Sequence, residues 1–377
     1  MGKVCVGKIQ QAPDGNPNQA TMSNHSPPPE FDENPDRPVS IGEATEQLLG
    51  GGTLSYELTC QVFESMMTGR VHHAEIGALL GILATRVPTG DEIAGAATIM
   101  RKHVRKVETS VDRTSLLDTA GTGGAPKTFN VSTAAAIVAA AGGANVAKHG
   151  NKSRTGRGSA ELLEGLGVNI RASLEVQTRC LDEFGVCFCF APNHHPATKH
   201  VMPVRKALGF PTIFNLLGPL TNPVQAGRQL MGVYGEQFLA PVAKAFQELG
   251  TVHTIVMHSE DGLDEISISA KTRGYEIRGS EIQPFCCEPE QFGFERVERS
   301  LVTTNSLSES IELVKKILNG QEDGPARNMV MMSSGVSLYL CGLSDSLESG
   351  VKEAGHLIQS GKAQEILEKL IAYTSTK

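Results

Sequence analysis

The stretch from Asp118 to Glu164 restricts the fold of this 377-residue chain more than any other part of it. Two glycine-rich and hydroxyl-rich segments, at 121–124 and 152–159, flank an alanine-rich segment from Ser132 to Ala141. Glycine lets main-chain N–H groups approach an anion without interference from a Cβ atom. The layout therefore predicts a phosphate-binding region built from two turns and one helix.

Strand and helix patterns alternate after Leu116. Short β-type runs at Val186–Phe190 and His253–Met257 alternate with helical stretches such as Ser132–Ala141 and Phe238–Leu249. This alternation predicts an α/β domain with a mainly parallel central sheet. Parallel sheets bind ligands beyond the carboxyl ends of their strands, which is where most of the motifs fall. A further β-type run lies at 146–147, and further helical runs lie at 160–166, 308–318 and 346–374.

The part of the chain before Leu116 has a different character. Residues 1–38 are rich in Pro, Asn, Ser and Asp, so they bury little apolar surface and we expect a disordered tail. Helical spacing without a strand signal follows, and Leu54-Ser55 is placed to begin its first long helix. We therefore expect a small all-helical domain at 39–108, joined by about 196–225, and a large α/β domain at 109–377.

Composition argues against several classes of function. The 34 Lys and Arg against 41 Asp and Glu give a formal charge of −7, which disfavours a nucleic-acid partner. The eight cysteines are scattered without a CxxC pair, which is typical of reduced thiols. Cys187-Phe-Cys189 and Cys286-Cys287 leave metal or redox chemistry as an alternative. No signal segment or membrane-spanning run is visible, so we expect a cytoplasmic protein with no membrane partner.

Residues beside the alanine-rich segment suit phosphate binding. Ser132 and Thr133 can cap that helix and leave main-chain N–H groups for a phosphate, although an ordinary N-cap explains the pair about as well. Lys148 follows a short apolar run and can act as a point charge for phosphate. His149 taken alone is better explained as a structural histidine. The basic loop at 152–158 fits an anion-binding loop or a solvated surface loop.

Three other segments carry candidate ligands. The acidic loop at 258–265 crowds several carboxylates, which a cation would offset, and Mg²⁺ takes one or two carboxylates together with substrate phosphates. An acidic surface loop is the alternative. His194 and His195 have no partner at metal-ligand spacing, so a structural or surface role is favoured. Arg205 is a candidate carboxylate ligand, with a solvated charge on a helix face as the alternative.

Taken together, these segments resemble the anthranilate phosphoribosyltransferase family, from the glycosyltransferase group related to pyrimidine nucleoside phosphorylases. The resemblance runs from about Ser40 to the C-terminus. It is carried by the ordered motifs GTGG, TFNVSTAAA, KHGN, GSAELLE, HHPATKHVMPVRKALGFPTIFNLLGPLTNP and DGLDEIS. It implies a homodimer with a small helical and a large α/β domain. It also implies Mg²⁺-dependent transfer of a phosphoribosyl group from phosphoribosyl pyrophosphate to an aromatic acid such as anthranilate, a step of tryptophan biosynthesis.

The resemblance also implies a role for individual residues. The pyrophosphate turn would be formed by Gly121 and Gly124. The phosphoribosyl group and its phosphates would be held by Thr128, Asn130, Ser132, Thr133 and Lys148, with His149 and Gly150 beside them. Mg²⁺ would be served by Ser132, Asp264 and Glu265. The path of anthranilate would be lined by Asn151, Arg205, Gly121 and Pro219. No general base is assigned.

The chain departs from the family pattern in both phosphate-binding loops. Ala125-Pro126 stands where the family continues with Asp-Gly, so a carboxylate and one N–H group are lost. The loop at 152–157 is one residue short, and Glu161 replaces an Asp. One hypothesis is that Arg154 or Arg157 compensates by holding the phosphates. Two alternatives stay open: a related transferase with a different donor or acceptor, and a non-catalytic paralogue that binds a ligand or nucleic acid.

Overall fold

The computed structural model describes residues 41–126 and 128–375. The tail expected at 1–38 lies outside these residues. The strands are β1 (Leu116–Asp118), β2 (Asn145–Gly150), β3 (Val186–Phe190), β4 (Arg228–Gly232), β5 (His253–Ser259), β6 (Thr272–Arg278) and β7 (Glu281–Cys287). Among the described residues no helix is long and apolar enough to cross a membrane.

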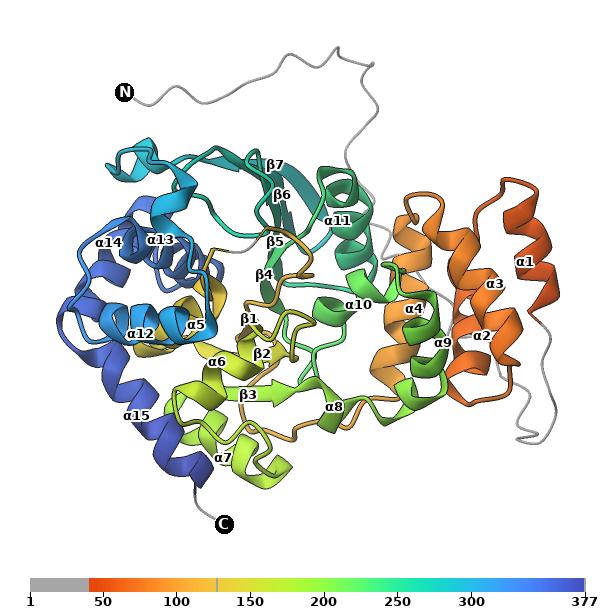
Figure 1. Ribbon diagram of the computed structural model, residues 1–377, viewed down its shortest axis with the longest axis horizontal. Coiled ribbons are helices and arrows are strands. Elements are labelled where there is room, and N and C mark those ends of the chain that lie inside the picture. Colours follow the sequence, from red (N-terminus) through yellow and green to blue (C-terminus); the bar gives the residue numbers. More distant parts are fainter. Residues whose placement is uncertain (1–40, 127, 376–377) are drawn as a thin grey trace, which may run out of the picture. The chain divides into compact units, whose positions relative to one another are not determined.

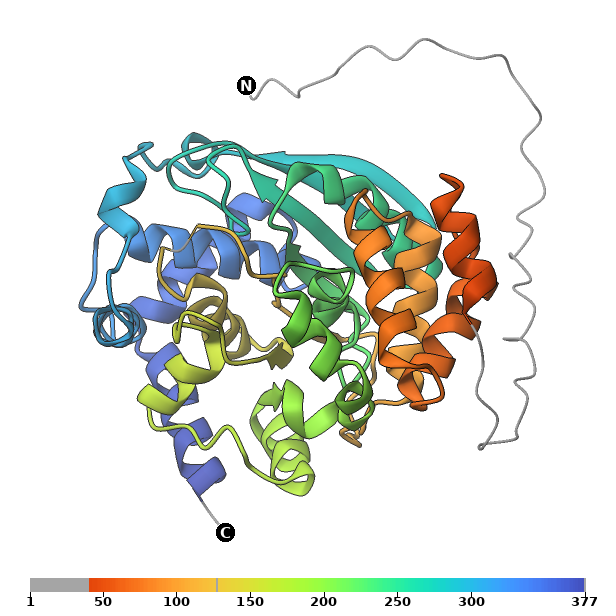
Figure 2. The same cartoon turned by 45° about the vertical axis from the view of Figure 1, so that its right-hand side comes forward.

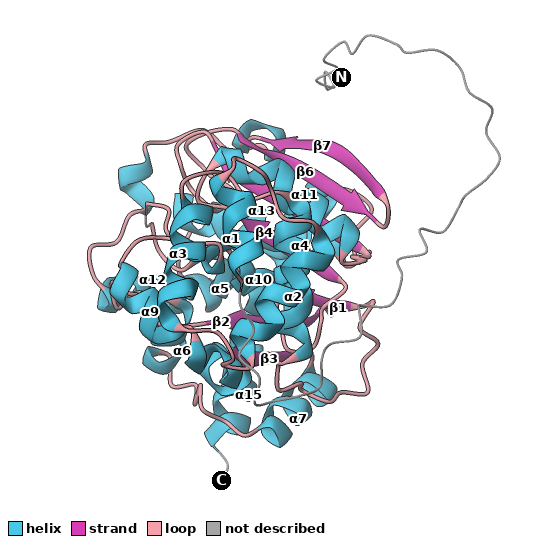
Figure 3. Ribbon diagram, turned by 90° about the vertical axis from the view of Figure 1, so that its right-hand side faces the viewer, coloured by secondary structure: helices cyan, strands magenta, loops and turns pink. Residues whose placement is uncertain are grey.

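The described strands form one sheet in the order β3-β2-β1-β4-β5-β6-β7. β1 to β5 are parallel, with Leu117 of β1 opposite Val146 on one side and Arg228 on the other. β6 and β7 form an antiparallel hairpin at one edge of the sheet (Figure 3). The predicted fold class is thus confirmed: a helical part is followed by an α/β part with a mainly parallel central sheet.

Helices cover both faces of the sheet (Figure 1). They are α5 (Val131–Ala141), α6 (Ser159–Gly165), α7 (Leu174–Phe184), α8 (Ala191–His194), α9 (Met202–Leu208), α10 (Phe214–Leu220), α11 (Leu239–Glu248), α12 (Leu307–Leu318), α13 (Pro325–Leu340), α14 (Leu347–Gln359) and α15 (Lys362–Ser375). α5 is apolar around its whole circumference and is buried under α13, α14 and α15. Its alanines are small and allow the neighbouring helices to approach closely. This packing holds the start of α5 beside the end of β1.

The first helices pack as a bundle: α1 (Gly42–Leu49), α2 (Tyr56–Met67), α3 (His73–Ala84) and α4 (Gly90–Lys102). α2 begins where the sequence placed a helix start, and Ser55 caps it by accepting a hydrogen bond from the N–H of Leu58. Thr89 and Glu92 form a capping box at the start of α4. The chain returns to this bundle later, because α9 packs on α3 and α10 packs on α4 (Figure 2).

Candidate functional site

The candidate site lies where the parallel strands end. The strand order reverses between β1 and β4, because β2 and β3 lie on one side of β1 while β4 and β5 lie on the other. Ligands of open α/β sheets bind outside the carboxyl ends of the strands at such a switch point. Most of the residues that the sequence singled out lie at the ends of β1, β2 and β5 or in the segments that follow these strands.

The GTGG turn packs tightly on the end of β4 and on the acidic loop after β5. The N–H of Thr122 donates to the carbonyl oxygen of Gly232 at 2.9 Å, and the N–H of Gly123 donates to Oδ2 of Asp264 at 3.0 Å. A Cβ atom on Gly121 would lie 3.2 Å from the same carboxylate oxygen, and Gly124 has φ +96°. Gly123 also has a positive φ, +65°, so glycine suits this turn at two positions for conformation, and at Gly121 for the close approach of Asp264.

Lys148 is buried at the end of β2 and directs its ammonium group toward β1 and α5. Its Nζ donates to the carbonyl and hydroxyl oxygens of Thr119 at 3.0 and 3.2 Å, and to the hydroxyl of Ser132 at 3.4 Å. Burial lowers the pKa of Lys148, while the nearby carboxylates of Asp118 and Glu265 oppose that shift. The structure thus brings Lys148 and Ser132 together, as the resemblance implied.

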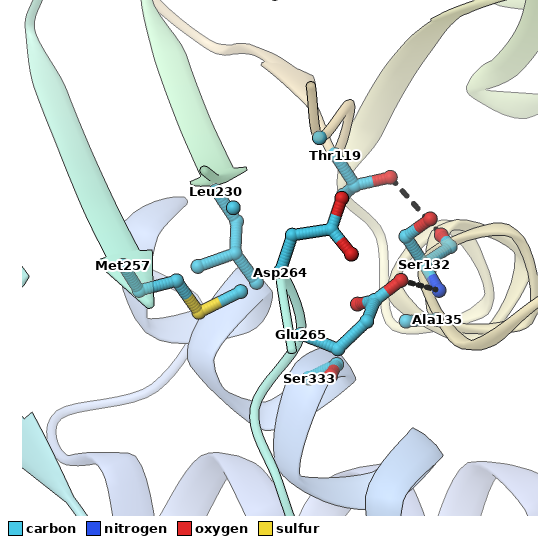
Figure 4. Close-up of a pocket in the computed structure, with 10 residues that line it drawn as sticks. Thr119, Ser132, Ala135, Leu230, Met257, Asp264, Glu265 and Ser333 are labelled. Atoms are coloured by element: carbon cyan, nitrogen blue, oxygen red, sulfur yellow. Dashed lines mark hydrogen bonds between the residues drawn. The ribbon is translucent and has the colours of Figure 1, made fainter. Parts of the chain in front are cut away.

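Asp264 and Glu265 present two carboxylates to the same pocket (Figure 4). Oε1 of Glu265 accepts the N–H of Ser132 at 3.2 Å. Burial, with the charge of Asp264 added to it, raises the pKa of Glu265 to about 8. The pocket between β1, α5, β4 and β5 is lined by Thr119, Gly121, Ser132, Ala135, Leu230, Gly232, Met257, Asp264, Glu265 and Ser333.

The donor atoms of this pocket fit Mg²⁺. They are all oxygens, and a divalent cation would relieve the repulsion between the carboxylates of Asp264 and Glu265. No group of three or more His, Cys, Asp or Glu side chains able to hold a metal occurs within the described parts of the chain. Two carboxylates with a hydroxyl suit an ion that shares its remaining positions with substrate phosphates and water.

Asp118 was not singled out by the sequence, yet its hydrogen bonds connect the strands beneath the candidate site. Its carboxylate is fully buried and accepts the N–H of His149 at 3.1 Å and the Asn222 side-chain amide at 2.8 Å. The same amide donates to the carbonyl oxygen of Ala147 at 2.7 Å. Burial raises the pKa of Asp118 to about 6, and the charge of Lys148 opposes this shift. Asp118 thus joins β1 and β2 to the segment after α10.

His149 and His195 form a buried, hydrogen-bonded pair. The Gly218 carbonyl oxygen can only accept, so Nδ1 of His149 donates to it at 3.0 Å. Nε2 of His149 then accepts from Nε2 of His195 at 3.1 Å. Burial lowers the pKa of both rings, that of His195 to about 4, so both are neutral near pH 7. His194 is also buried, between Gln177 and the carbonyl of Arg105.

Arg205, Pro219 and Asn151 do not line the pocket that holds the carboxylates. The guanidinium of Arg205 stacks over the ring of Phe214, with its Cζ 4.9 Å from the centroid. Within the described residues no carboxylate forms an ion pair with Arg205, and its Nη1 donates to the sulfur of Met202 at 3.7 Å. Pro219 is buried in α10, whereas Asn151 is exposed and accepts the N–H of Lys152 at 2.7 Å.

The remaining predicted residues lie at the entry to α5, outside the carboxylate pocket. Thr128 is buried, and the side chain of Asn130 bonds within the protein to Arg157 and Ser310. The hydroxyl of Thr133 is buried and has no hydrogen-bond partner within the described part of the chain. Gly150 ends β2, and a Cβ atom there would overlap Ser159 at 2.2 Å, so its glycine serves packing.

Glu161 accepts hydrogen bonds from both ends of the shortened loop after β2. Its carboxylate accepts the N–H of Ser153 at 3.1 Å and that of Gly158 at 3.0 Å. The second contact holds the main chain of Gly158, the residue that precedes α6. The longer Glu side chain in place of Asp therefore ties this loop to the helix that follows it.

Both parts of the fold match models of one enzyme class. A model described as "Glycosyl transferase family, helical bundle domain" matches residues 42–104. A second, described as "Glycosyl transferase family, a/b domain", matches residues 113–364. The helices α1 to α4 lie within the first match, and the sheet with the candidate site lies within the second. The fold and its site are therefore of the glycosyl transferase class.

Relatives with known names narrow this class. The anthranilate phosphoribosyltransferase of Methylococcus capsulatus is 43% identical over 336 residues, which are 89% of this chain and 98% of that protein. The enzyme of the same name from Halorhodospira halophila is 43% identical over 338 residues, 89% of this chain and 98% of the relative. This chain belongs to the anthranilate phosphoribosyltransferase family.

Solved structures agree with this assignment. The anthranilate phosphoribosyltransferase of Thermus thermophilus superposes with a TM-score of 0.82 at 37% identity, covering 88% of this chain and 99% of that one. The Saccharomyces cerevisiae enzyme in complex with PRPP and Mg superposes with a TM-score of 0.79 at 27% identity, covering 89% and 99%. The likeness therefore extends over both the helical and the α/β part.

Proposed function

We propose that this protein transfers the phosphoribosyl group of phosphoribosyl pyrophosphate to anthranilate, which gives N-(5-phosphoribosyl)anthranilate and pyrophosphate in tryptophan biosynthesis. One observation carries the proposal: the GTGG turn, Lys148 and the Asp264–Glu265 pair meet at the carboxyl ends of the parallel strands. Glycine-rich turns and positive charge favour phosphate ligands, and here the turn, the ammonium of Lys148 and a Mg²⁺ ion bound by the carboxylates would supply them. The named relatives and solved structures support the same reaction.

The residues of the pocket act by position and charge. The turn at 121–124 would hold the pyrophosphate, and Lys148 with Ser132 would hold the phosphoribosyl group. Mg²⁺ held by Asp264, Glu265 and Ser132 would supply positive charge to the pyrophosphate as its bond to the sugar breaks. The amine of the acceptor would form a bond to the anomeric carbon and lose one proton, while the bond from that carbon to pyrophosphate breaks, so charge develops on both the ring and the leaving group. Fixed charges that surround this centre stabilise that state without reorganisation.

Arg205 would hold the carboxylate of anthranilate. Its guanidinium is half-buried beside Phe214 and has no acid of the described residues paired with it. A fork of N–H donors binds a carboxylate bidentately, and the neighbouring ring offers an apolar surface to an aromatic acid. We propose that Asn151, Gly121 and Pro219 lie along the same path.

Loss of anthranilate fluorescence in the presence of phosphoribosyl pyrophosphate and Mg²⁺ tests the reaction. Calorimetry tests the metal, because donor binding should tighten when Mg²⁺ is present. Asp264→Asn and Glu265→Gln should abolish that tightening. Glu260→Gln is the matched control, since Glu260 is an exposed acid of the same loop that pairs with Arg273. Equal donor affinity with and without Mg²⁺ in the wild type would remove the metal from the mechanism.

A transferase with a different donor is the second candidate, and the turn after GTGG is the observation that favours it. Ala125-Pro126 offers neither a carboxylate nor an N–H at residue 126. Turnover of anthranilate with a different pentose phosphate, and none with phosphoribosyl pyrophosphate, would support this candidate. A non-catalytic paralogue is disfavoured, because Lys148, Asp264 and Glu265 are retained around one pocket.

We also propose a cytoplasmic homodimer with two domains in each chain. The small domain would comprise 39–108 with about 196–225, and the large domain 109–377; the packing of α3 on α9 and of α4 on α10 supports this division. Leu49 and Phe210 of the helical part are 69% and 45% exposed, and burial against a second copy would remove them from water. Light scattering that gives the mass of one chain would refute the dimer.

A further inference from the structure

Arg157 binds protein carbonyl groups through the end of its side chain. It lies in the short loop between β2 and α6 and is half-buried. Its Nη2 donates to the carbonyl oxygens of Thr128 at 3.1 Å and of Thr304 at 2.6 Å. The same nitrogen lies 2.9 Å from the hydroxyl oxygen of Thr304, which accepts. Arg157 therefore connects its loop by hydrogen bonds to the segments that contain Thr128 and Thr304.

These contacts are part of a larger junction. The carbonyl oxygen of Thr128 also accepts the N–H and the hydroxyl of Thr304, at 3.1 and 3.0 Å. The side-chain amide of Asn130 donates to the carbonyl oxygen of Arg157 at 3.3 Å, and its Oδ1 accepts the hydroxyl of Ser310 at 2.8 Å. We call Thr128, Asn130, Arg157, Thr304 and Ser310 the Arg157 junction. It joins the entry of α5, the loop before α6 and the start of α12.

The junction bears directly on the candidate site, because α5 begins within it. Asn130 precedes the first residue of α5, and Ser132 in its first turn meets both Lys148 and Glu265. Ordering a segment such as 128–130 costs conformational entropy at each residue. Hydrogen bonds from a charged donor are about twice as strong as neutral ones, so Arg157 is well suited to offset this cost.

We propose that Arg157 is a positioning residue for the phosphoribosyl donor: it fixes the entry of α5, and thereby Ser132, through Thr128 and Thr304. This inference rests on the proposed function, since it names the site that the junction serves. It also replaces the hypothesis that Arg157 grips the phosphates, because the described contacts of its guanidinium are to protein oxygens. The loop that is one residue short thus supplies, through Arg157, hydrogen bonds that hold the entry of α5 in place.

Steady-state kinetics of Arg157→Ala, Arg157→Lys and Thr304→Val test the proposal. Arg157→Ala should raise the KM for phosphoribosyl pyrophosphate about tenfold or more, because hydrogen bonds from a charged group are lost. The KM for anthranilate should stay within about twofold, since Arg205 is untouched. Arg157→Lys should recover part of the loss, because an ammonium can still reach one carbonyl. Arg179→Ala, at a surface pair with Glu183 on α7, is the unchanged control.

Two further measurements separate positioning from a general loss of stability. Amide hydrogen exchange should quicken at Thr304, whose N–H binds Thr128 in the junction, while amides in α13 stay protected. Thr304→Val keeps the shape of the side chain and removes its hydroxyl, so it tests the junction even if Arg157→Ala folds poorly. The two variants combined should cost less than the sum of each alone, because both act on the carbonyl of Thr128.

The results that would overturn the role of Arg157 differ from those that would overturn the proposed function. If Arg154→Ala raises the donor KM as much as Arg157→Ala, the loop acts through its charge on the substrate and the proposal is overturned. An equal rise in both substrate KM values with unchanged exchange at Thr304 overturns it as well. If the wild type shows no turnover and no donor binding, the proposed function fails, whereas the exchange experiment still reports whether Arg157 orders the entry of α5.

Discussion

Replacing Gly232 with alanine should displace the acidic loop from the candidate site. Gly232 ends β4, and a Cβ atom there would lie 1.8 Å from the carbonyl oxygen of Asp264. Contacts below 3.0 Å are essentially never made by real Cβ atoms, so the main chain of Asp264 must retreat by about 1.2 Å, the difference of these two distances. Displacement of a reacting group by about 1 Å costs roughly 100-fold in rate. We therefore expect kcat/KM to fall about 100-fold.

The assay is the loss of anthranilate fluorescence at several Mg²⁺ concentrations, with circular dichroism to show that the variant folds. The variant should also lose the tightening of donor binding by Mg²⁺, since Asp264 is one of the proposed ligands. Gly81→Ala in α3 is the matched control: nothing lies within 4 Å of the added Cβ, and an alanine within a helix should stabilise by up to about 1 kcal/mol. A Gly232→Ala enzyme with kcat/KM within about twofold of the wild type would refute this reasoning.

Two other predictions concern acceptor binding and acid stability. Arg205→Ala should raise the KM for anthranilate about tenfold to a hundredfold, because a bond to a charged group contributes about 1.5–3 kcal/mol; a rise confined to the donor KM would show that Arg205 does not hold the acceptor. Burial acts to raise the pKa of Glu276, but hydrogen bonds from His253 and Tyr339 outweigh it and lower this pKa from 4.5 to about 2. A lowered carboxyl pKa stabilises the fold above about pH 4.5, and that contribution is lost as the pH falls through about 2. Urea unfolding should therefore show that wild type loses up to about 3 kcal/mol more than Glu276→Gln between pH 7 and pH 2; parallel losses would mean that this carboxylate is not the cause.

The order of secondary structure was largely predictable from the sequence. Helix caps such as Ser55 and apolar runs such as Val186–Phe190 act locally, within one turn or one strand. The hairpin of β6 and β7 was not predicted, because its alternation is interrupted by Gly274 and Pro284. The run at 346–374 was expected as one helical stretch, but it is α14 and α15, separated at Gly361 with φ +80°. Glycine takes this left-handed conformation at no steric cost.

The candidate site was predictable as a set of motifs, and only partly as a set of contacts. The meeting of Lys148 with Ser132 followed from the resemblance, since both motifs occur in order along the chain. The role of Asp118 did not, because a lone Asp after two leucines carries no signal of burial. The contact between Gly123 and Asp264 joins residues 141 positions apart, and no local pattern reports such a pair. Arg154 or Arg157 was a hypothesis for holding the phosphates, because Arg suits anions, and the sequence did not indicate that Arg157 also donates to the carbonyl oxygens of Thr128 and Thr304.

The sequence by itself determined the alternation of strands and helices, the glycines of the GTGG turn and the motifs that mark the family. These features are local, since periodicity, capping and backbone conformation depend on neighbours a few residues away. Only the tertiary structure decided which oxygens Arg157 reaches, that Asp118 is buried, and that Gly232 must lack a side chain for Asp264 to fit. Those outcomes depend on the strand order β2-β1-β4-β5, which brings together, at the carboxyl ends of these strands, turns that are far apart in the chain. A side chain's charge predicts which partners suit it, whereas packing decides which of them it meets.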